Sequence, residues 1–197
     1  MNKGTAIFIA IAVSLVLLVM WGIVAYNTLI GLDQAVSSAW SQVENQYQRR
    51  ADLIPNLVNT VKGFAAQERE VLTGVVEARA KATSIQVTKE VLEDPEAFAK
   101  FQSAQDQFST AISRLLAVAE NYPVLRSNEN FLSLQNELAG TENRIAVERR
   151  RFNEVVQTYN TTRARFPGVI IANLAGFREK AYFKAKEGAD APPDVKF

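Results

Sequence analysis

The sequence predicts an all-α protein, in which an N-terminal transmembrane helix is followed by an antiparallel up-and-down four-helix bundle. Three observations support this fold class. No charged residue occurs between Lys3 and Asp33. Beyond that region the apolar residues recur every three or four positions, and no alternating pattern typical of a strand stands out. The helical segments are also long, with short turns between them and heptad spacing, as in helix bundles.

The charge-free N-terminal segment predicts the membrane anchor. Residues 5–25 read TAIFIAIAVSLVLLVMWGIVA, with Ser14 as the one polar residue after Thr5. About 20 apolar residues in a helix match a hydrocarbon core about 30 Å thick. A helix also satisfies its own backbone groups in lipid. A cleaved signal peptide is less favoured, because the run is too long and lacks a small-x-small cleavage site. We therefore predict an uncleaved anchor over residues 1–28.

The orientation of the anchor depends on few charges. Lys3 and the terminal amine lie on the short side, whereas Asp33 and Glu44 come first on the long side. Arg49 and Arg50 lie beyond the roughly 15–20 residues over which flanking cations set topology. The charge distribution favours a cytoplasmic N-terminus with the bundle outside, although one lysine leaves the opposite orientation open.

Composition excludes most enzyme classes. The chain has neither histidine nor cysteine, which excludes zinc sites, Ser-His and Cys-His nucleophiles, and disulfides. There is no Gly-rich phosphate loop. Without Lys3, the 22 basic residues become 21 and balance the 21 acidic residues, so no basic surface for nucleic acid is expected. We therefore predict no enzymatic activity, no cofactor, no nucleic-acid partner, and no catalytic, cofactor-binding or metal residues.

Residues 29–166 are predicted to form the bundle. Its first helix continues the anchor as far as Tyr47, with Gly31 as the one weak point. Asp52 is a candidate cap for a second helix, since Pro55 would then fall in the first turn, where its missing N–H costs nothing. The apolar pattern of this helix fades near Ala82, and residues 83–93 are predicted to form a loop, with a frayed helix end as the alternative.

The last two bundle helices have clearer boundaries. Asp94 and Pro95 combine a capping carboxylate with proline at the first helical position. The apolar pattern that follows ends at Pro123. A final helix is predicted from Ser127 or Asn128 to the sequence Phe-Pro-Gly at residues 166–168.

Several polar residues occupy core-type positions in the predicted helices. They are Glu68, Gln105, Thr141 and Glu148. Inward carboxylates can hold a hard cation, but di-metal bundles use Glu-x-x-His, and this chain has no histidine. The favoured interpretation is that Glu68 and Glu148 form ion pairs with arginines, which would set helix register at little net stability. The candidate partners are Arg50, Arg79, Arg144 and Arg149.

Residues 167–197 form a C-terminal tail rich in apolar side chains. These are Ile170, Ile171, Leu174, Phe177, Tyr182, Phe183, Val195 and Phe197. The favoured interpretation is a short helix and an extended strip packed back on the bundle. The alternative is a docking segment for a partner, because exposed apolar patches often mark interfaces.

Several motifs along the chain resemble one known family. They include Ala39-Trp40-Ser41-Gln42-Val43, Arg49-Arg50-Ala51-Asp52-Leu53-Ile54-Pro55-Asn56-Leu57-Val58, Glu120-Asn121-Tyr122-Pro123, Arg150-Arg151-Phe152-Asn153 and Phe166-Pro167. The chain resembles the bacterial LemA family over nearly its whole length. The resemblance implies a single-pass membrane protein with a four-helix bundle, without an established activity or an agreed active site. Some members of that family are magnetosome-membrane proteins, and others occur alongside a membrane metalloprotease.

Two functional hypotheses follow. The first is a membrane-anchored helical-bundle scaffold or adaptor of the bacterial cell envelope, held in the inner (cytoplasmic) membrane, without catalytic activity of its own. Its expected partners are the lipid bilayer and other membrane or envelope proteins, and self-association into a homo-oligomer stays open. The alternative is a ligand- or cation-sensing module that uses the carboxylates of Glu68 and Glu148.

Overall fold

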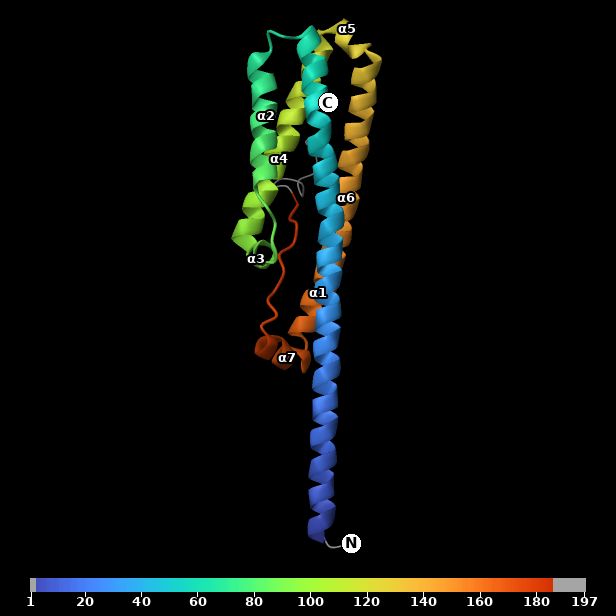
Figure 1. Ribbon diagram of the computed structural model, residues 1–197, viewed down its shortest axis with the longest axis vertical. Coiled ribbons are helices and arrows are strands. Elements are labelled where there is room, and N and C mark those ends of the chain that lie inside the picture. The colour runs from blue at the N-terminus through green and yellow to red at the C-terminus, as the bar shows by residue number, and fades with distance from the viewer. Residues whose placement is uncertain (1–2, 186–197) are drawn as a thin grey trace, which may run out of the picture. The chain divides into compact units, whose positions relative to one another are not determined.

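A computed structural model describes residues 3–185 of the 197-residue chain, and these residues form helices and connecting segments without any strand (Figure 1). The elements are α1 (Lys3–Phe64), α2 (Arg69–Ser84), α3 (Lys89–Glu93), α4 (Pro95–Val118), a 3-10 turn η1 (Ala119–Asn121), α5 (Pro123–Arg126), α6 (Glu129–Ala164) and α7 (Gly168–Ala175). The predicted all-α fold class is confirmed: a long apolar N-terminal helix is followed by a helical bundle. That the bundle has four helices stays a prediction.

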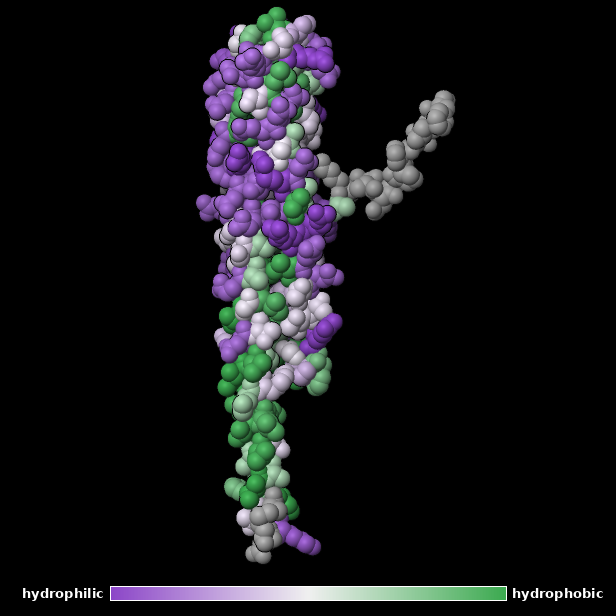
Figure 2. Space-filling view, turned by 90° about the vertical axis from the view of Figure 1, so that its right-hand side faces the viewer, coloured by the Kyte–Doolittle hydropathy of each residue, from purple (hydrophilic) through white to green (hydrophobic). Residues whose placement is uncertain are grey.

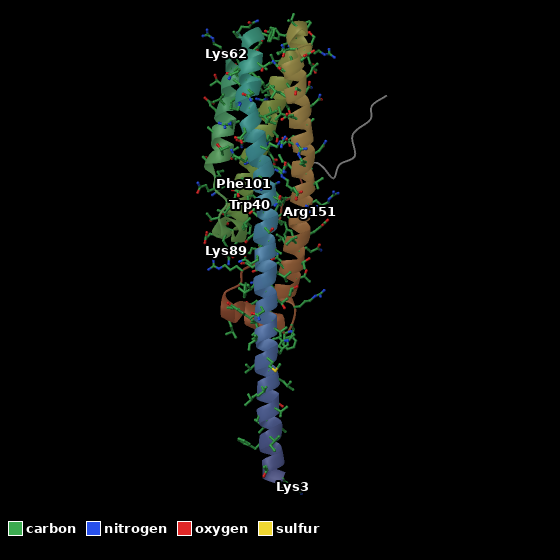
Figure 3. The ribbon with its side chains drawn as sticks, turned by 45° about the vertical axis from the view of Figure 1, so that its right-hand side comes forward. Lys3, Trp40, Lys62, Lys89, Phe101 and Arg151 are labelled. Atoms are coloured by element: carbon green, nitrogen blue, oxygen red, sulfur yellow. The ribbon has the colours of Figure 1, made fainter. Side chains whose placement is uncertain are left out.

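Helix α1 joins the apolar N-terminal segment to the bundle without a break. Within residues 3–185 it is the one helix long and apolar enough to cross a membrane, and none of its most apolar window is buried inside the structure. Figure 2 shows hydrophobic residues covering this part of α1, and Figure 3 shows Lys3 at its start. The helix passes Gly31 without interruption.

The predicted boundary between the first two bundle helices is wrong. Asp52 does not cap a new helix; its carboxylate accepts a hydrogen bond from the Gln48 amide (2.8 Å), one turn earlier in the same helix. Pro55 lies inside α1, which ends only at Phe64. The physical reason is the buried face of α1, because Ala51, Ile54 and Leu57 continue one line of core residues through the proline. Burial of this face outweighs the local cost of proline in a helix.

The predicted loop over residues 83–93 is only partly a loop. Helix α2 continues to Ser84, and α3 occupies Lys89–Glu93 with Leu92 buried. By contrast, the cap at Asp94 is confirmed, since its carboxylate accepts hydrogen bonds from the backbone N–H groups of Glu96 (2.8 Å) and Ala97 (3.2 Å). The Asn128 side chain likewise accepts from the N–H of Phe131 (3.1 Å), at the predicted start of α6.

The structure divides into two compact units, which share the two longest helices. The first unit contains Met1–Asp52 and Glu137–Lys180, and the second contains Leu53–Asn136 and Ala181–Phe197. This division differs from the predicted division into anchor (1–28), bundle (29–166) and tail (167–197). The predicted segments were defined by their expected roles and not by compactness, and they stay predictions.

In the first unit α1 and α6 run antiparallel. Arg50 contacts Glu142, Tyr47 contacts Arg149, and Trp40 contacts Phe152, so residue numbers rise along α6 as they fall along α1. The rings of Trp40 and Phe152 pack edge to face, with centroids 5.7 Å apart. The core of α6 follows Ile145, Phe152, Val156 and Tyr159. Val156, four residues after Phe152, is buried, whereas Val155 is half-buried.

In the second unit α2 and α4 also run antiparallel. The Gln105 amide donates to the carbonyl of Ala82 (3.1 Å) at one end, whereas Gln67 and Glu68, which precede α2, bond the Tyr122 hydroxyl at the other. The apolar core of this unit contains buried side chains from both helices and from the end of α1. Its larger members are Leu57, Val61, Leu72, Val75, Phe98, Phe101, Phe108, Ile112 and Leu115.

Candidate interaction surface and inward polar side chains

Glu68 lies in the connection between α1 and α2 and is half-buried. Its carboxylate accepts a hydrogen bond from the Tyr122 hydroxyl (3.0 Å), which in turn accepts one from the Gln67 amide (2.7 Å). The partner of Glu68 is therefore a tyrosine and not the predicted arginine. Burial, together with the hydrogen bond and the negative charge of Glu68, raises the pKa of the Tyr122 phenol above its usual value of 10.0.

Glu148 on α6 is also half-buried, and it forms an ion pair within its own helix. Arg151 lies one turn later, with its guanidinium nitrogen 3.3 Å from the carboxylate, and its side chain is largely exposed. The pair is not with any of the arginines that the sequence suggested. An exposed pair at this spacing contributes little to stability. Arg150 points to solvent, so the run of three arginines at 149–151 forms no single basic patch.

Glu68 and Glu148 each have their own partner on the protein, the Tyr122 hydroxyl and the Arg151 guanidinium. Within residues 3–185 there is also no group of three or more acidic side chains placed to hold a metal ion. No observation on the described residues favours the cation-sensing hypothesis.

A buried cation, Arg50, lies between α1 and α6. The sequence suggested Glu68 or Glu148 as its partner, but it pairs with Glu142. The Arg50 side chain is only 1% exposed, and its guanidinium donates to the Glu142 carboxylate at 2.6 Å. The ring of Tyr47 lies beside two guanidinium groups, those of Arg50 (5.2 Å) and Arg149 (5.5 Å). Arg149 Nε also donates to the Tyr47 hydroxyl at 2.6 Å. These contacts pair Arg50 with Glu142 and Arg149 with Tyr47, and they join α1 to α6.

The second buried ion pair attaches the C-terminal tail to α1. Lys180 Nζ lies 2.9 Å from the Asp33 carboxylate, and the two side chains are 2% and 11% exposed. The side-chain amide of Asn160 on α6 both donates to the Lys180 carbonyl (2.9 Å) and accepts from the Lys180 N–H (3.0 Å). The sequence does not indicate this pair, because Asp33 and Lys180 lie far apart along the chain.

Further hydrogen bonds hold the segment between α7 and Lys180 against α6. The Tyr159 hydroxyl donates to the Arg178 carbonyl (2.8 Å), and Arg163 Nε donates to the Phe177 carbonyl (2.8 Å). The Phe177 ring packs edge to face on Tyr26 of α1, with centroids 5.9 Å apart. Residues 168–180 thus form a short helix and an extended segment that contact α1 and α6, whereas the packing of the whole tail on the bundle stays a prediction. The predicted tail residues Val195 and Phe197 lie outside the described residues.

The strip continues into the second unit at its last described residues. Gln102 on α4 donates to the Lys184 carbonyl (2.8 Å) and accepts from the Lys184 N–H (3.1 Å). Phe183 is buried against Phe98, with ring centroids 4.8 Å apart. An open groove of about 700 Å³ runs beside this contact along α4. Its lining is mainly small and polar and includes Gln102, Ser103 and Thr110.

Not all of the tail is covered. Phe166 and Leu174 are each 81% exposed and Ile170 is 47% exposed, although Ala172 in the same helix is fully buried. Helix α7 thus has one face packed in the first unit and one apolar face that is open. The predicted docking role of the tail stays a prediction, and this open face is the candidate interaction surface.

The comparisons with known proteins agree with this architecture. The family model of the LemA family matches residues 39–197. The chain is 28% identical to magnetosome protein MamQ of Magnetospirillum gryphiswaldense, over 98% of this chain and 77% of the relative. It is 26% identical to magnetosome protein MamQ 2 of Paramagnetospirillum magneticum, over 95% and 75%. It is 22% identical to protein LemA of Metamycoplasma hominis, over 82% and 69%.

The family match and the single apolar helix together describe a single-pass, membrane-associated protein. The family match covers all of the structure beyond the first part of α1, including the buried ion pair between Arg50 and Glu142, the α6 helix and the packed tail. On these grounds the chain belongs to the LemA family.

Proposed function

We propose that this protein is a membrane-anchored helical scaffold or adaptor of the bacterial cell envelope, without catalytic activity of its own. The observation that carries the proposal is the continuity of α1, which runs from Lys3 in the apolar anchor to Phe64 in the helical bundle. A partner bound to the bundle is thereby connected to the membrane through a single helix, with no intervening linker.

The inward polar groups support a structural role. Arg50 is matched by Glu142, Lys180 by Asp33, and Glu68 by Tyr122. Buried charges that are already paired stabilise a particular helix register, and they offer no reactive group to a substrate. The magnetosome relatives support a role at a membrane by analogy, which is an argument from association rather than from a site.

The finer parts of the proposal concern location and partners. We place the protein in the inner membrane, with the N-terminus in the cytoplasm and the bundle outside, because Lys3 is the charge nearest the anchor on the short side. The partners are other membrane or envelope proteins, further copies of this chain, or both.

Proximity labelling in living cells tests the proposal. A labelling enzyme is fused after Phe197 of the full chain, and an unrelated single-pass membrane protein with the same fusion is the control. We expect a reproducible set of labelled envelope proteins that the control does not label. Light scattering of the purified protein in detergent then tests self-association. Labelling identical to the control, together with a strictly monomeric protein, would contradict a scaffold function.

A further inference from the structure

The open face of α7 lies at the level of the membrane anchor. A Cβ atom placed at Gly22 of α1 would lie 3.7 Å from Cδ1 of Ile171, so α7 packs directly on this part of α1 (Figure 1). Gly22 belongs to the apolar run of residues 5–25, and it lies about 4.5 Å before the end of that run, at a rise of about 1.5 Å per residue. A soluble domain that stopped at the water boundary would not reach this level.

The burial pattern of α1 shows how far the packed structure extends toward the bilayer. The described side chains up to Met20 are all exposed, whereas Trp21, Gly22 and Ala25 are half-buried and Leu29 is buried. Packing therefore begins within the last turn and a half of the apolar run. Trp and Tyr are enriched at the membrane–water interface, and Trp21 and Tyr26 stand on either side of the end of this run.

The sequence around α7 has the composition of an interfacial membrane segment. Residues 166–177 contain no charged side chain, and Arg165 and Arg178, both exposed, flank this run on its two sides. Arginine side chains at such positions extend to the headgroups while their neighbours contact acyl chains. Glu179 is the one acidic residue between Arg163 and Lys180.

We propose that α7 inserts its exposed apolar face into the lipid leaflet beside the anchor, so that the protein has a second membrane contact. The occupant is lipid because α7 packs on the part of α1 that is itself in the membrane. Ile170 and Leu174 are four residues apart and therefore share one face, which with Phe166 meets acyl chains. Arg165 and Arg178 then lie among the headgroups.

Site-directed spin labelling tests this proposal on the full chain, which has no cysteine of its own. Leu174→Cys carries a nitroxide label, and the protein is reconstituted in vesicles of phosphatidylcholine and phosphatidylglycerol. Relaxation by oxygen, which concentrates in lipid, is compared with relaxation by a water-soluble nickel chelate. Val147→Cys on α6 is the matched control in water, since Val147 is also an exposed apolar residue, and Leu15→Cys in the anchor is the control in lipid.

We expect the ratio of oxygen to nickel accessibility at position 174 to exceed that at position 147 severalfold and to stay below that at position 15, because oxygen concentrates toward the centre of the bilayer. A label at 174 that is as accessible to nickel as the label at 147 would overturn the proposal. Shielding from both reagents would also overturn it, because a protein surface would then cover α7. Ile170→Cys provides a second probe of the same face, and circular dichroism checks that each labelled chain keeps its helix content.

Discussion

At the scale of single residues, the buried cations of this protein depend on carboxylates that reach them from the neighbouring helix. Arg50 adjoins the core residue Ala51 on α1, and its own exposed fraction is 1%. Glu142 is 42% exposed, so it approaches Arg50 from the edge of the core. An ion pair of this kind contributes little net stability when intact, but it is costly to break from one side.

Glu142→Gln should lower the free energy of unfolding by about 1–3 kcal/mol, because the buried Arg50 charge loses the carboxylate that compensates it. Unfolding in detergent, followed by circular dichroism, measures the change. The matched control is Glu137→Gln, which removes a charge from the same helix. Glu137 and Arg49 are about half exposed and 4.0 Å apart, so this change should cost less than about 0.5 kcal/mol. Equal effects of the two substitutions would contradict the assignment.

The contact between Tyr122 and Glu68 should depend on pH in the alkaline range. The pKa of Tyr122 is raised above 10.0 by burial and by Glu68, so the folded state holds the phenol proton more tightly than the unfolded state does. The resulting stabilisation is fully present below pH 10.0 and is lost as the pH rises through the folded-state pKa.

A spectroscopic titration of tyrosinate tests this pH dependence. Tyr122→Phe should remove a tyrosine transition that lies above pH 10.0, and the melting temperature of the variant should fall less steeply above pH 10.0 than that of the natural chain. Loss of a transition at or below pH 10.0 instead would contradict the raised pKa of Tyr122. Tyr182→Phe, which replaces another tyrosine of this chain, is the control.

At the scale of the elements, the start of a helix was predictable where a capping side chain comes directly before it. Asp94 caps α4 and Asn128 caps α6, as their positions before the apolar patterns predict. Asp52 and Pro55 have the same local signature, yet α1 continues through them. The difference is the buried line of Ala51, Ile54 and Leu57, whose packing is not visible in a local motif.

The extended segment after α7, which contains Lys180, is attached to α1 by a pair that a single substitution can break. Asp33→Asn leaves the buried ammonium of Lys180 without its carboxylate, and it should lower the free energy of unfolding by about 3–5 kcal/mol. Trypsin should then cleave faster at Arg178, which is exposed. Chemical unfolding and limited proteolysis measure the two effects.

A double substitution separates charge from packing in this pair. Asp33→Asn combined with Lys180→Met removes both charges and keeps an unbranched side chain at position 180, so most of the lost stability should return. A double variant no more stable than Asp33→Asn alone would show that the ion pair itself, and not an unpaired charge, governs the attachment. The bonds between Asn160 and the Lys180 backbone are unchanged in both variants.

At the scale of the whole molecule, the anchor should govern how the protein partitions into membranes. Arginines in place of both Val13 and Leu17 should raise the apparent free energy of insertion by about 5–7 kcal/mol, because each costs about 2.5–3.5 kcal/mol near the centre of a span. The substituted chain should move from the membrane pellet to the soluble fraction after alkaline carbonate extraction. Exchanging the two apolar residues, Val13→Leu with Leu17→Val, should leave the protein in the pellet.

The candidate interaction surface was predictable only in part. The apolar tail residues Ile170 and Leu174 were identified from composition, but the same list contains Phe177 and Phe183, which are buried. Composition does not distinguish the two groups. Which of these side chains are buried depends on how the tail packs against the other helices. Glu68 and Glu148 are half-buried, but Glu68 lies in a connection and not on a helix face, and neither carboxylate pairs with an arginine of another helix as the spacing suggested.

The sequence by itself determined the helical character of the chain, its anchor and the caps of its later helices, since these depend on composition and on contacts within a few residues. It also excluded the chemistry that requires histidine or cysteine. Only the tertiary structure decided that α1 continues through Pro55, that Arg50 meets Glu142 and that Lys180 meets Asp33. Each of these outcomes depends on residues far apart along the chain, whose proximity is set by packing. For the same reason the charge-free N-terminal segment proved to be more than a tether, because its last turn already contacts α7.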